Sequence, residues 1–486
     1  MNRHVRILCA GLILPLAACT VGPTFKRPEA PASEAYLPRD ERPAVPSSAS
    51  GQPSTNEFEQ HIIAGAAVGA DWWAAFDSPA LNELVATAIA NNQTLAAARA
   101  TLAQAQELAG AAAGARYPQV SLNAGAGNQQ YGAQFLGTFS VPAFSYVAVG
   151  ATVSYTLDFT GGIARTIEEQ RALAQYEQSE TEAVYLTLTG NVVMQAITVA
   201  STHAQIQAVD DLIVQDRDNL KLVQTEFENG SASKVDVLTA QSQLASDQTL
   251  LPPLRQQLAA ARHALALLVG HAPSEWAAPD FELTSLKLPR ELPLSLPSEL
   301  VRHRPDILAA EAQLHAATAA VGVATANLYP QITLSASLGQ QALADQADQL
   351  FNSANTAWTL ISGITAPVFK GGTLRAERRA AVDALRASSA NYQQTVLASF
   401  VQVADLLDAL DHDAELLAAQ SSALGTARSN TELARESYRV GYTGLLQVVD
   451  AQRLLLTAQL GLLRAQAQQY VDTAQLYLAL GGGALH

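Results

Sequence analysis

The sequence predicts a mostly helical α+β protein built from two copies of one unit, each holding a pair of amphipathic strands and a long antiparallel helical hairpin. Three observations predict this fold class. Short motifs recur in the same order at nearly one offset, and apolar and polar residues alternate in two segments, one in each repeat. Two Ala-, Gln- and Leu-rich stretches, 163–229 and 373–440, contain no proline, which is typical of unbroken helices.

The N-terminus is typical of a secretory signal peptide. Arg3 and Arg6 precede an apolar run at 7–16 that is too short to span a membrane, and small residues stand directly before Cys19. The Leu-Ala-Ala-Cys sequence at 16–19 resembles the bacterial lipobox, in which the cysteine is lipidated and becomes the first mature residue. We therefore predict a signal peptide over 1–18, a covalent lipid on Cys19 and no other cofactor. Because 26–60 is rich in Pro, Ser and charge, we expect an extended arm over 19–70.

Charge and cysteine content exclude several classes of protein. Cleavage before Cys19 removes two arginines, which takes the formal net charge from −15 to −17, and it removes the only other cysteine, Cys9. The mature chain therefore forms no internal disulfide. A charge this negative argues against nucleic acid as a partner, because phosphate binding needs a basic surface. No uninterrupted apolar run of about 18 residues follows Cys19, so any membrane-spanning part must be a β-barrel.

An internal repeat organises the chain. ARYPQVSL at 115–122 returns as NLYPQITL at 327–334, FTGG at 159–162 as FKGG at 369–372, and FENG at 227–230 as YRVG at 438–441. All three pairs are separated by nearly the same length of chain. Three matches in one order indicate a tandem duplication with a first repeat at 71–297 and a second at 298–486.

Each repeat begins with a helix, 81–115 or 298–328, that runs into Tyr-Pro and stops there. Alternation then predicts strands at 147–158 in the first repeat and at 331–339 in the second. Strands at 118–127 and 356–366 complete one hairpin in each repeat. Their length of about 10 residues fits tilted transmembrane strands. Four strands cannot close a barrel, and open edges are excluded from lipid. The barrel must therefore be pooled from several identical chains, and three chains would supply twelve strands.

After a Gly-Gly turn, each repeat continues as a helix of about 100 Å, at 163–229 and at 373–440. Gly230 and Gly441 end these helices, and second helices return at 234–270 and 445–480. We expect Pro252 and Pro253 to kink or interrupt the first return helix. A plain coiled-coil stalk would explain these helices, but it would leave the paired alternating strands unexplained.

The chain resembles the TolC-like outer-membrane efflux proteins, most closely the lipidated branch of the OprM and NodT type. The motifs that carry the resemblance span the mature chain: CTVGP at 19–23, DWW at 71–73, Tyr-Pro at 117–118, RPDI at 304–307, VDAQ at 449–452 and LGGG at 480–483. The resemblance implies a homotrimer whose 12-stranded β-barrel lies in the outer membrane and continues into a periplasmic α-helical barrel. It also implies docking to a periplasmic membrane-fusion adaptor and an inner-membrane pump, with the RND type expected.

The same resemblance assigns roles at the hairpin tips. Leu446 and Asp450 fall where lipidated members close the periplasmic aperture, and Asp236 and Tyr438 match positions of the TolC tip network. TolC has an aspartate where this chain has Gln447 and an arginine where it has Thr443, so its ion-pair lock is at least partly missing. The turns expected to dock the adaptor contain Gly230, Ser231, Gly441 and Thr443.

Other candidate sites are weaker. Asp405, Asp408, Asp411, His412 and Asp413 form an acidic run that we interpret as a solvated helix face rather than a metal site. Glu311 and His315 have the spacing of a metal-binding pair on one helix face, and we interpret them too as part of a solvated helix face. No nucleophile, dinucleotide or P-loop motif is present, so we predict no catalytic or metal site and no enzyme.

We therefore predict a passive outer-membrane duct of a tripartite efflux system that expels small molecules or drugs. The outlet of an ABC-driven type I protein secretion system is the alternative within the same fold. Heavy-metal efflux is a further alternative, but a single methionine, Met194, remains after processing, which argues against a thioether relay for soft metals.

Overall fold

The computed structural model describes residues 20–31, 35–37, 60–66, 68–131 and 142–482. The predicted signal peptide and Cys19 lie outside the described residues. The chain forms two compact units, and unit 1 comprises Met1–Pro28, Thr101–Glu177 and Ala310–Tyr392. Unit 2 comprises Glu29–Ala100, Gln178–Ala309 and Gln393–His486. Four described helices, α3, α4, α8 and α9, carry the chain from one unit into the other.

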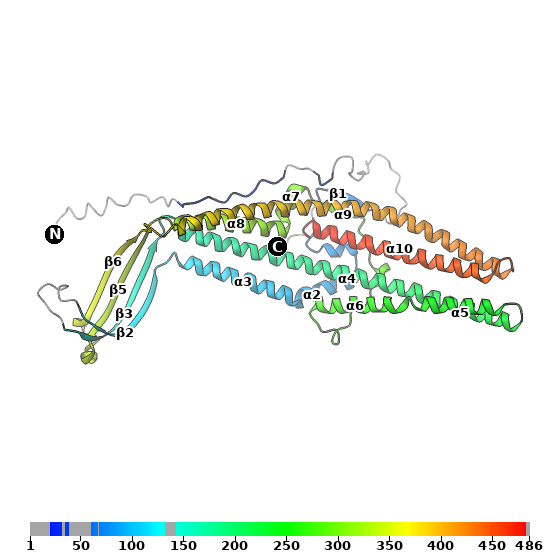
Figure 1. The fold of residues 1–486 in the computed structure, drawn as a ribbon, viewed down its shortest axis with the longest axis horizontal. Coiled ribbons are helices and arrows are strands. Elements are labelled where there is room, and N and C mark those ends of the chain that lie inside the picture. The colour runs from blue at the N-terminus through cyan, green and yellow to red at the C-terminus, as the bar shows by residue number, and fades with distance from the viewer. Residues whose placement is uncertain (1–19, 32–34, 38–59, 67, 132–141, 483–486) are drawn as a thin grey trace. The chain divides into compact units, whose positions relative to one another are not determined.

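Unit 1 contains one antiparallel sheet of four strands in the order β2-β3-β5-β6 (Figure 1). The strands are β2 (Gln119–Gln129), β3 (Phe144–Leu157), β5 (Gln331–Leu343) and β6 (Thr356–Thr365). Each repeat supplies one hairpin, and β3 pairs with β5 to join the two. Strands β3 and β5 were predicted from period-two alternation, and β2 and β6 were predicted as the strands that complete the two hairpins. Short 3-10 turns η3 (Ala344–Gln349) and η4 (Ser353–Asn355) lie between β5 and β6.

Two glycines allow the hairpins of the two repeats to meet closely. Gly150 on β3 lies opposite Gly339 on β5. A Cβ atom added to Gly150 would lie 2.8 Å from the Gly339 Cα, and one added to Gly339 would lie 2.6 Å from the Val149 carbonyl oxygen. Any side chain here would therefore push the two strands apart.

The helices before the strands are each broken once. The first repeat has α2 (Pro79–Asn91) and α3 (Gln93–Gly114), and the second has α7 (Pro297–His303) and α8 (Pro305–Ala326). The predicted single helices 81–115 and 298–328 were therefore wrong at Asn92 and Arg304, which are equivalent positions of the duplication. Asn92 caps α3 by accepting a hydrogen bond from the Leu95 amide at 3.0 Å, while Pro305 is the first residue of α8.

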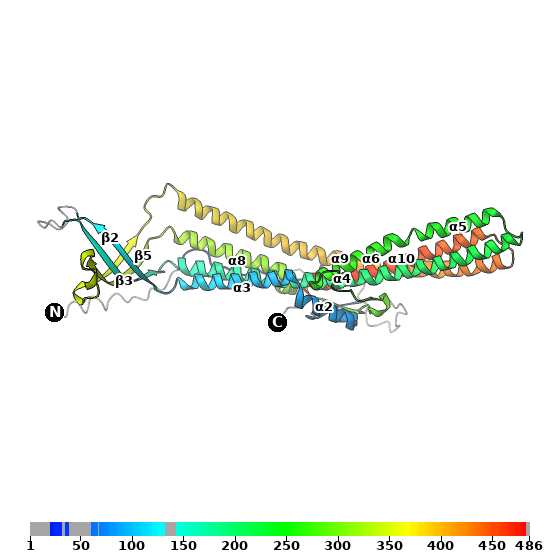
Figure 2. The same cartoon turned by 90° about the horizontal axis from the view of Figure 1, so that it is seen from below.

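Each repeat then forms a long helical hairpin (Figure 2). The outgoing helices α4 (Gly162–Glu228) and α9 (Thr373–Arg439) have 67 residues each. The first return is split into α5 (Lys234–Gln248) and α6 (Leu251–Val269), where two prolines occupy the first turn of α6. The expected interruption is confirmed. The second return, α10 (Leu445–Ala479), is continuous.

Within unit 2, the main apolar core joins both repeats around the 3-10 helix η1 (Trp72–Phe76). The Trp72 ring stacks on Tyr477 at 5.6 Å between centroids. A short parallel pair, β1 (His61–Ala64) with β4 (Glu291–Leu294), lies in the same unit, as does the 3-10 turn η2 (Leu283–Ser285). The expectation that 19–70 is only an extended arm was therefore wrong at β1.

Two of the described helices, α4 and α8, contain an 18-residue stretch with the length and composition of a membrane span, but half of each stretch is buried inside the protein. Such stretches are also typical of core helices.

Candidate functional site: the four-stranded sheet and the hairpin tips

One face of the sheet is apolar across all four strands. The register aligns Leu122 with Ala151, Ala151 with Leu338, and Leu338 with Trp358. The exposed large apolar side chains of this face are those of Val120, Leu122, Leu157, Leu334, Leu338, Trp358, Leu360 and Ile364. Water would disfavour an apolar surface of this extent, whereas the hydrocarbon core of a bilayer accepts it.

The opposite face is mostly polar, with Ile361 and Leu343 as exposed apolar exceptions. The Asn123 amide donates to the Thr152 hydroxyl at 3.1 Å, and the hydroxyls of Ser337 and Thr359 are hydrogen-bonded at 2.6 Å. A sheet with one apolar and one hydrophilic face is the arrangement of a barrel wall around a water-filled lumen.

The sheet is not closed within one chain. In the described part of the chain, β2 pairs only with β3, and β6 pairs only with β5. Unpaired strand edges are not tolerated in lipid, because their backbone N–H and C=O groups have no water to bond. Other copies must therefore complete the wall.

Both hairpins turn at their tips in the same way. Gly230 and Gly441 each have a φ of +79°, which favours glycine. The Ser231 amide donates to the Glu226 carbonyl at 2.8 Å, and the Tyr442 amide donates to the Ser437 carbonyl at 2.9 Å. These six-to-one bonds define Schellman motifs, which satisfy carbonyls at the ends of α4 and α9.

The two tips are joined by packing and by one strong hydrogen bond. A small apolar cluster combines Val223 of α4 and Val237 of α5 with Leu445 and Val449 of α10. Beside it, the Tyr438 hydroxyl of α9 donates to Glu226 Oε2 of α4 at 2.6 Å. Burial, and then this bond to Glu226, raise the pKa of Tyr438, so the tyrosine stays protonated and keeps donating.

Asp236 acts locally rather than between the hairpins. Its carboxylate accepts from the Ser233 amide at 2.9 Å and from the Ser233 hydroxyl at 2.7 Å, which completes a capping box at the start of α5. These bonds lower the pKa of Asp236. The resemblance pointed to Tyr438 and Asp236 but not to Glu226, the acceptor that the tyrosine uses. On the sequence alone, Glu226 is one of many helix-surface acids.

The predicted aperture residues lie on the first turns of α10. Leu446 is 62% exposed, and Asp450 lies one turn later, also exposed, with its carboxylate 3.6 Å from the Arg453 guanidinium. Gln447 is exposed, whereas the Thr443 hydroxyl is buried without a hydrogen-bond partner. A single chain thus presents Leu446 and Asp450 to its surroundings and does not itself form a constriction.

The acidic run on α9 was expected to form a solvated helix face, and one of its residues is instead buried. Asp405, Asp408 and Asp411 are exposed, but Asp413 is buried at 8% exposure. Glu311 also departs from a plain solvated residue, because it pairs with Arg27 at 2.8 Å. Among the described residues, no group of three or more His, Cys, Asp or Glu side chains is arranged to hold a metal ion.

Comparison with known proteins identifies the family. The model of the family described as "Outer membrane efflux protein" matches residues 84–271 and 296–482, one segment in each repeat. The pyoverdine export outer membrane protein OpmQ of Pseudomonas aeruginosa is 32% identical over 99% of this chain and 97% of its own. The cation efflux system protein CusC of Escherichia coli is 27% identical over 97% of each chain.

Solved structures agree with these sequence matches. The outer-membrane channel OprN superposes with a TM-score of 0.84 at 28% identity, covering 96% of this chain and 99% of that one. CusC superposes with a TM-score of 0.79 at 25% identity, covering 96% of this chain and all of the other. The chain is an outer-membrane efflux channel that extends into the periplasm, and it belongs to the outer membrane efflux protein family.

Proposed function

We propose that three copies of this chain form a passive duct that carries small molecules from a periplasmic adaptor and an inner-membrane pump to the outside. The observation that carries the proposal is the four-stranded sheet, apolar on one face, polar on the other and unpaired along β2 and β6. Three such sheets make a barrel of twelve strands, which is wider than the filled eight-stranded size. The energy comes from the pump, and the duct performs no catalysis.

The position of the N-terminal arm supports a lipid anchor on Cys19. Thr20, the next residue, packs on Gly161, just beyond the end of β3. The Val21 amide donates to the Thr160 carbonyl at 3.0 Å, and Phe25 stacks on His315. Thr20 and Val21 therefore lie where strands give way to helices, which is the level at which acyl chains enter a bilayer. A relative, SilC of Salmonella typhimurium, bears the name probable outer membrane lipoprotein.

Leu446 and Asp450 form the aperture of this duct. They stand one helical turn apart on one side of α10, so three copies near an axis would stack a leucine ring on an acidic ring. Arg453, which pairs with Asp450, moderates the repulsion among three carboxylates. A leucine ring excludes water and so closes the resting duct, while the acidic ring attracts cations and so favours them over anions at the entrance.

The turns that contain Gly230, Ser231, Gly441 and Thr443 dock the adaptor. Exposed apolar side chains surround them, among them Val235 at 69% and Tyr442 at 87% exposure. Exposed apolar groups on a protein tip mark an interaction site. The named cargoes of the relatives differ and include pyoverdine, toluene and cations. This variety fits a duct that selects weakly and takes its cargo from the pump.

The test is photo-cross-linking in cells from the two tips. A photo-reactive residue replaces Ser231 or Tyr442, and one replacing Glu415, which is exposed on α9, is the control. Capture of the adaptor of a proton-driven pump from the tips, but not from the control, is the expected result. Capture of an ABC exporter's adaptor instead would turn the function toward secretion, and capture of no adaptor would contradict the tripartite system.

The aperture is tested by conductance. The double variant Leu446→Ala, Asp450→Ala should conduct more in planar bilayers than the wild-type trimer, because both rings are removed. An unchanged single-channel conductance would contradict the assignment. Leu416→Ala, the same truncation at an exposed leucine of α9 away from the tips, is the matched control.

A further inference from the structure

Each helical hairpin contains a pair of buried aspartates, one on each of its two helices. In the first hairpin, Asp216 of α4 faces Asp247 of α5 within hydrogen-bonding range, and in the second, Asp413 of α9 faces Asp472 of α10 in the same way. The four side chains are between 3% and 8% exposed. Buried carboxylates without a cation are costly, so two such pairs in one protein require an explanation.

Both pairs occupy core positions of their hairpins. Asp216 precedes Gly230 by about four helical turns, and Asp247 follows Ser233 by the same stretch of helix. In the second hairpin, Asp413 precedes Gly441 by about eight helical turns, and Asp472 follows Gly444 by the same number of turns. The pairs therefore stand about 21 Å and about 42 Å from their tips. Four turns correspond to about two heptads, so both pairs occupy the same kind of inward-facing position.

The two members of each pair have different surroundings. Asp247 Oδ2 accepts from the Gln243 amide at 2.8 Å, and Asp472 Oδ2 accepts from the Gln468 amide at 2.9 Å. The partner oxygens have no such donor, because Oδ2 of Asp216 and Oδ2 of Asp413 are buried with no N–H or hydroxyl partner. A proton on Asp216 or Asp413 supplies the missing donor and bonds the two carboxyl groups together.

Burial and the facing carboxylate favour a proton on Asp216 and on Asp413. Burial, followed by the interaction with Asp247, raises the pKa of Asp216 to about 7, and burial with Asp472 raises the pKa of Asp413 to about 7. His412, beside Asp413 on α9, acts in the opposite direction. From the neighbouring helix α9, Arg435 hydrogen-bonds to Gln215, next to Asp216, rather than to either carboxylate.

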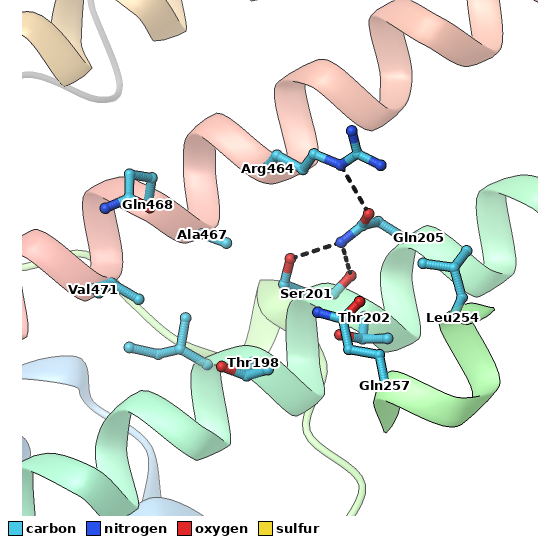
Figure 3. A pocket seen from close by; sticks show the side chains of 11 residues that line it. Thr198, Ser201, Thr202, Gln205, Leu254, Gln257, Arg464, Ala467, Gln468 and Val471 are labelled. Atoms are coloured by element: carbon cyan, nitrogen blue, oxygen red, sulfur yellow. Dashed lines mark hydrogen bonds between the residues drawn. The ribbon is translucent and has the colours of Figure 1, made fainter. Parts of the chain in front are cut away.

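One residue bonded to the second pair also lines a cavity. A polar cavity of about 410 Å³ lies between α4, α6 and α10, and Figure 3 shows Arg464, Gln205 and Ser201 hydrogen-bonded along it. Gln468 lines this cavity and is the residue that donates to Asp472.

We propose that the two aspartate pairs are proton-operated clamps, which hold the helices of each hairpin together while a proton is shared and loosen them when it leaves. Two unprotonated carboxylates in a dry helix interface repel each other, so the helices separate around the pair. The acidity of the periplasm thereby sets how firmly the hairpins are closed. This inference does not depend on which cargo the channel carries.

The sign of the effect follows from proton linkage. The closed hairpin binds its proton more tightly than an opened one, in which the aspartates return to ordinary acidity. The clamp is therefore fully engaged in acid and is lost as the pH rises through about 7. Between pH 5 and pH 7, release of one proton makes hairpin opening about tenfold more frequent for each pH unit.

The experiment is amide hydrogen exchange of the full-length trimer in lipid nanodiscs, measured by mass spectrometry from pH 5 to pH 8 and corrected for the intrinsic pH dependence of exchange. Peptides around Asp216 and Asp413 should exchange more readily as the pH rises to 7, and then level off. Asp216→Asn and Asp413→Asn should each abolish this dependence in their own hairpin only, because an amide donates without titrating. Corrected rates that do not change with pH would overturn the proposal.

The controls are exposed aspartates two residues away. Asp218→Asn on α4 and Asp411→Asn on α9 make the same charge change on the surface and should keep the wild-type dependence. If an asparagine variant does not fold, Asp216→Ala with Asp247→Ala replaces it, because Ala427 and Ala458 occupy the equivalent positions of the second hairpin. Persistence of the pH dependence in that double variant would equally overturn the proposal.

Discussion

The two hairpin tips share one turn but differ in what stabilises it. At the first tip, the Ser231 hydroxyl donates back to the Glu226 carbonyl, and α5 begins with the Ser233–Asp236 capping box. At the second, the residue that precedes α10 is Gly444, which has no side chain to cap the helix. The first tip is thus fixed by its own residues, whereas the second depends on Tyr438 and on packing against the first hairpin. We infer that the second tip is the part that moves when the aperture opens.

The largest expected effect comes from breaking the bond between the tips. Tyr438→Phe removes a hydrogen bond to a carboxylate, and we expect a loss of about 1.5 to 3 kcal/mol in the stability of the closed tip. Amide exchange should rise at 434–450 far more than at 226–240, and single-channel conductance should increase. Tyr442→Phe, the same chemical change at an exposed tyrosine, is the control. Equal exchange at both tips would contradict the comparison.

The turn glycines allow the two tips to be compared directly, because an alanine would be strained equally at Gly230 and at Gly441. Gly230→Ala and Gly441→Ala each force a side chain into a φ of +79°, with open space around it, and each should cost about 1 to 2 kcal/mol. We expect a similar loss of thermal stability but a larger rise in conductance for Gly441→Ala. Gly444→Ala, at a φ of −85°, is the unstrained control. A larger conductance change in Gly230→Ala would reverse the assignment of the moving tip.

Exchanging the caps tests the difference directly. Ser233→Ala removes the cap of α5 and should destabilise the first tip by about 1 kcal/mol, whereas Gly444→Ser should stabilise the start of α10 by roughly 0.3 kcal/mol. Hydrogen exchange at each tip measures both effects. Ser231→Ala, which leaves the capping box intact, separates the cap from the bond to Glu226. If Gly444→Ser also lowers conductance, flexibility at this helix start contributes to opening.

The smallest effect is a pH dependence confined to the first tip. The bonds from Ser233 lower the pKa of Asp236 below its ordinary value of 3.8. Its contribution is therefore present above that value and is lost as the pH falls through the lower pKa of the folded state. Exchange at 230–240 should increase slightly below pH 4, and Asp236→Asn should remove this increase. The same acid-induced change at the start of α10, which has no such carboxylate, would show that Asp236 is not the cause.

The sequence predicted the features that depend on local physics. Alternation located β3 and β5, proline-free stretches located α4 and α9, and glycines located the turns at Gly230 and Gly441. Each of these signals acts through the residue's own backbone or its near neighbours. The roles of Leu446 and Asp450 as an aperture rest on the family resemblance and stay a prediction.

What could not be predicted depends on contacts between distant residues. The break at Asn92 is supported by a bond from its amide to the Leu268 carbonyl of α6, and β1 forms only because β4, from the far end of the first repeat, lies beside it. Asp413 and Glu226 look like ordinary surface acids until the facing helix is known. A pattern along one helix shows which face is polar, but not which polar residue meets a partner.

The alternating directions of the strands in the sheet have a consequence for heredity. Because β2 and β6 run in opposite directions, β6 of one copy can meet β2 of the next in an antiparallel pair, and every copy uses both edges. In the proposed trimer, a chain that folds normally but cannot pair through β2 or β6 still enters the assembly and leaves the barrel unclosed. In a cell that makes both forms equally, only a small minority of rings would lack a faulty copy. Mutations in β2 or β6 should therefore be dominant, whereas mutations that prevent folding should be recessive.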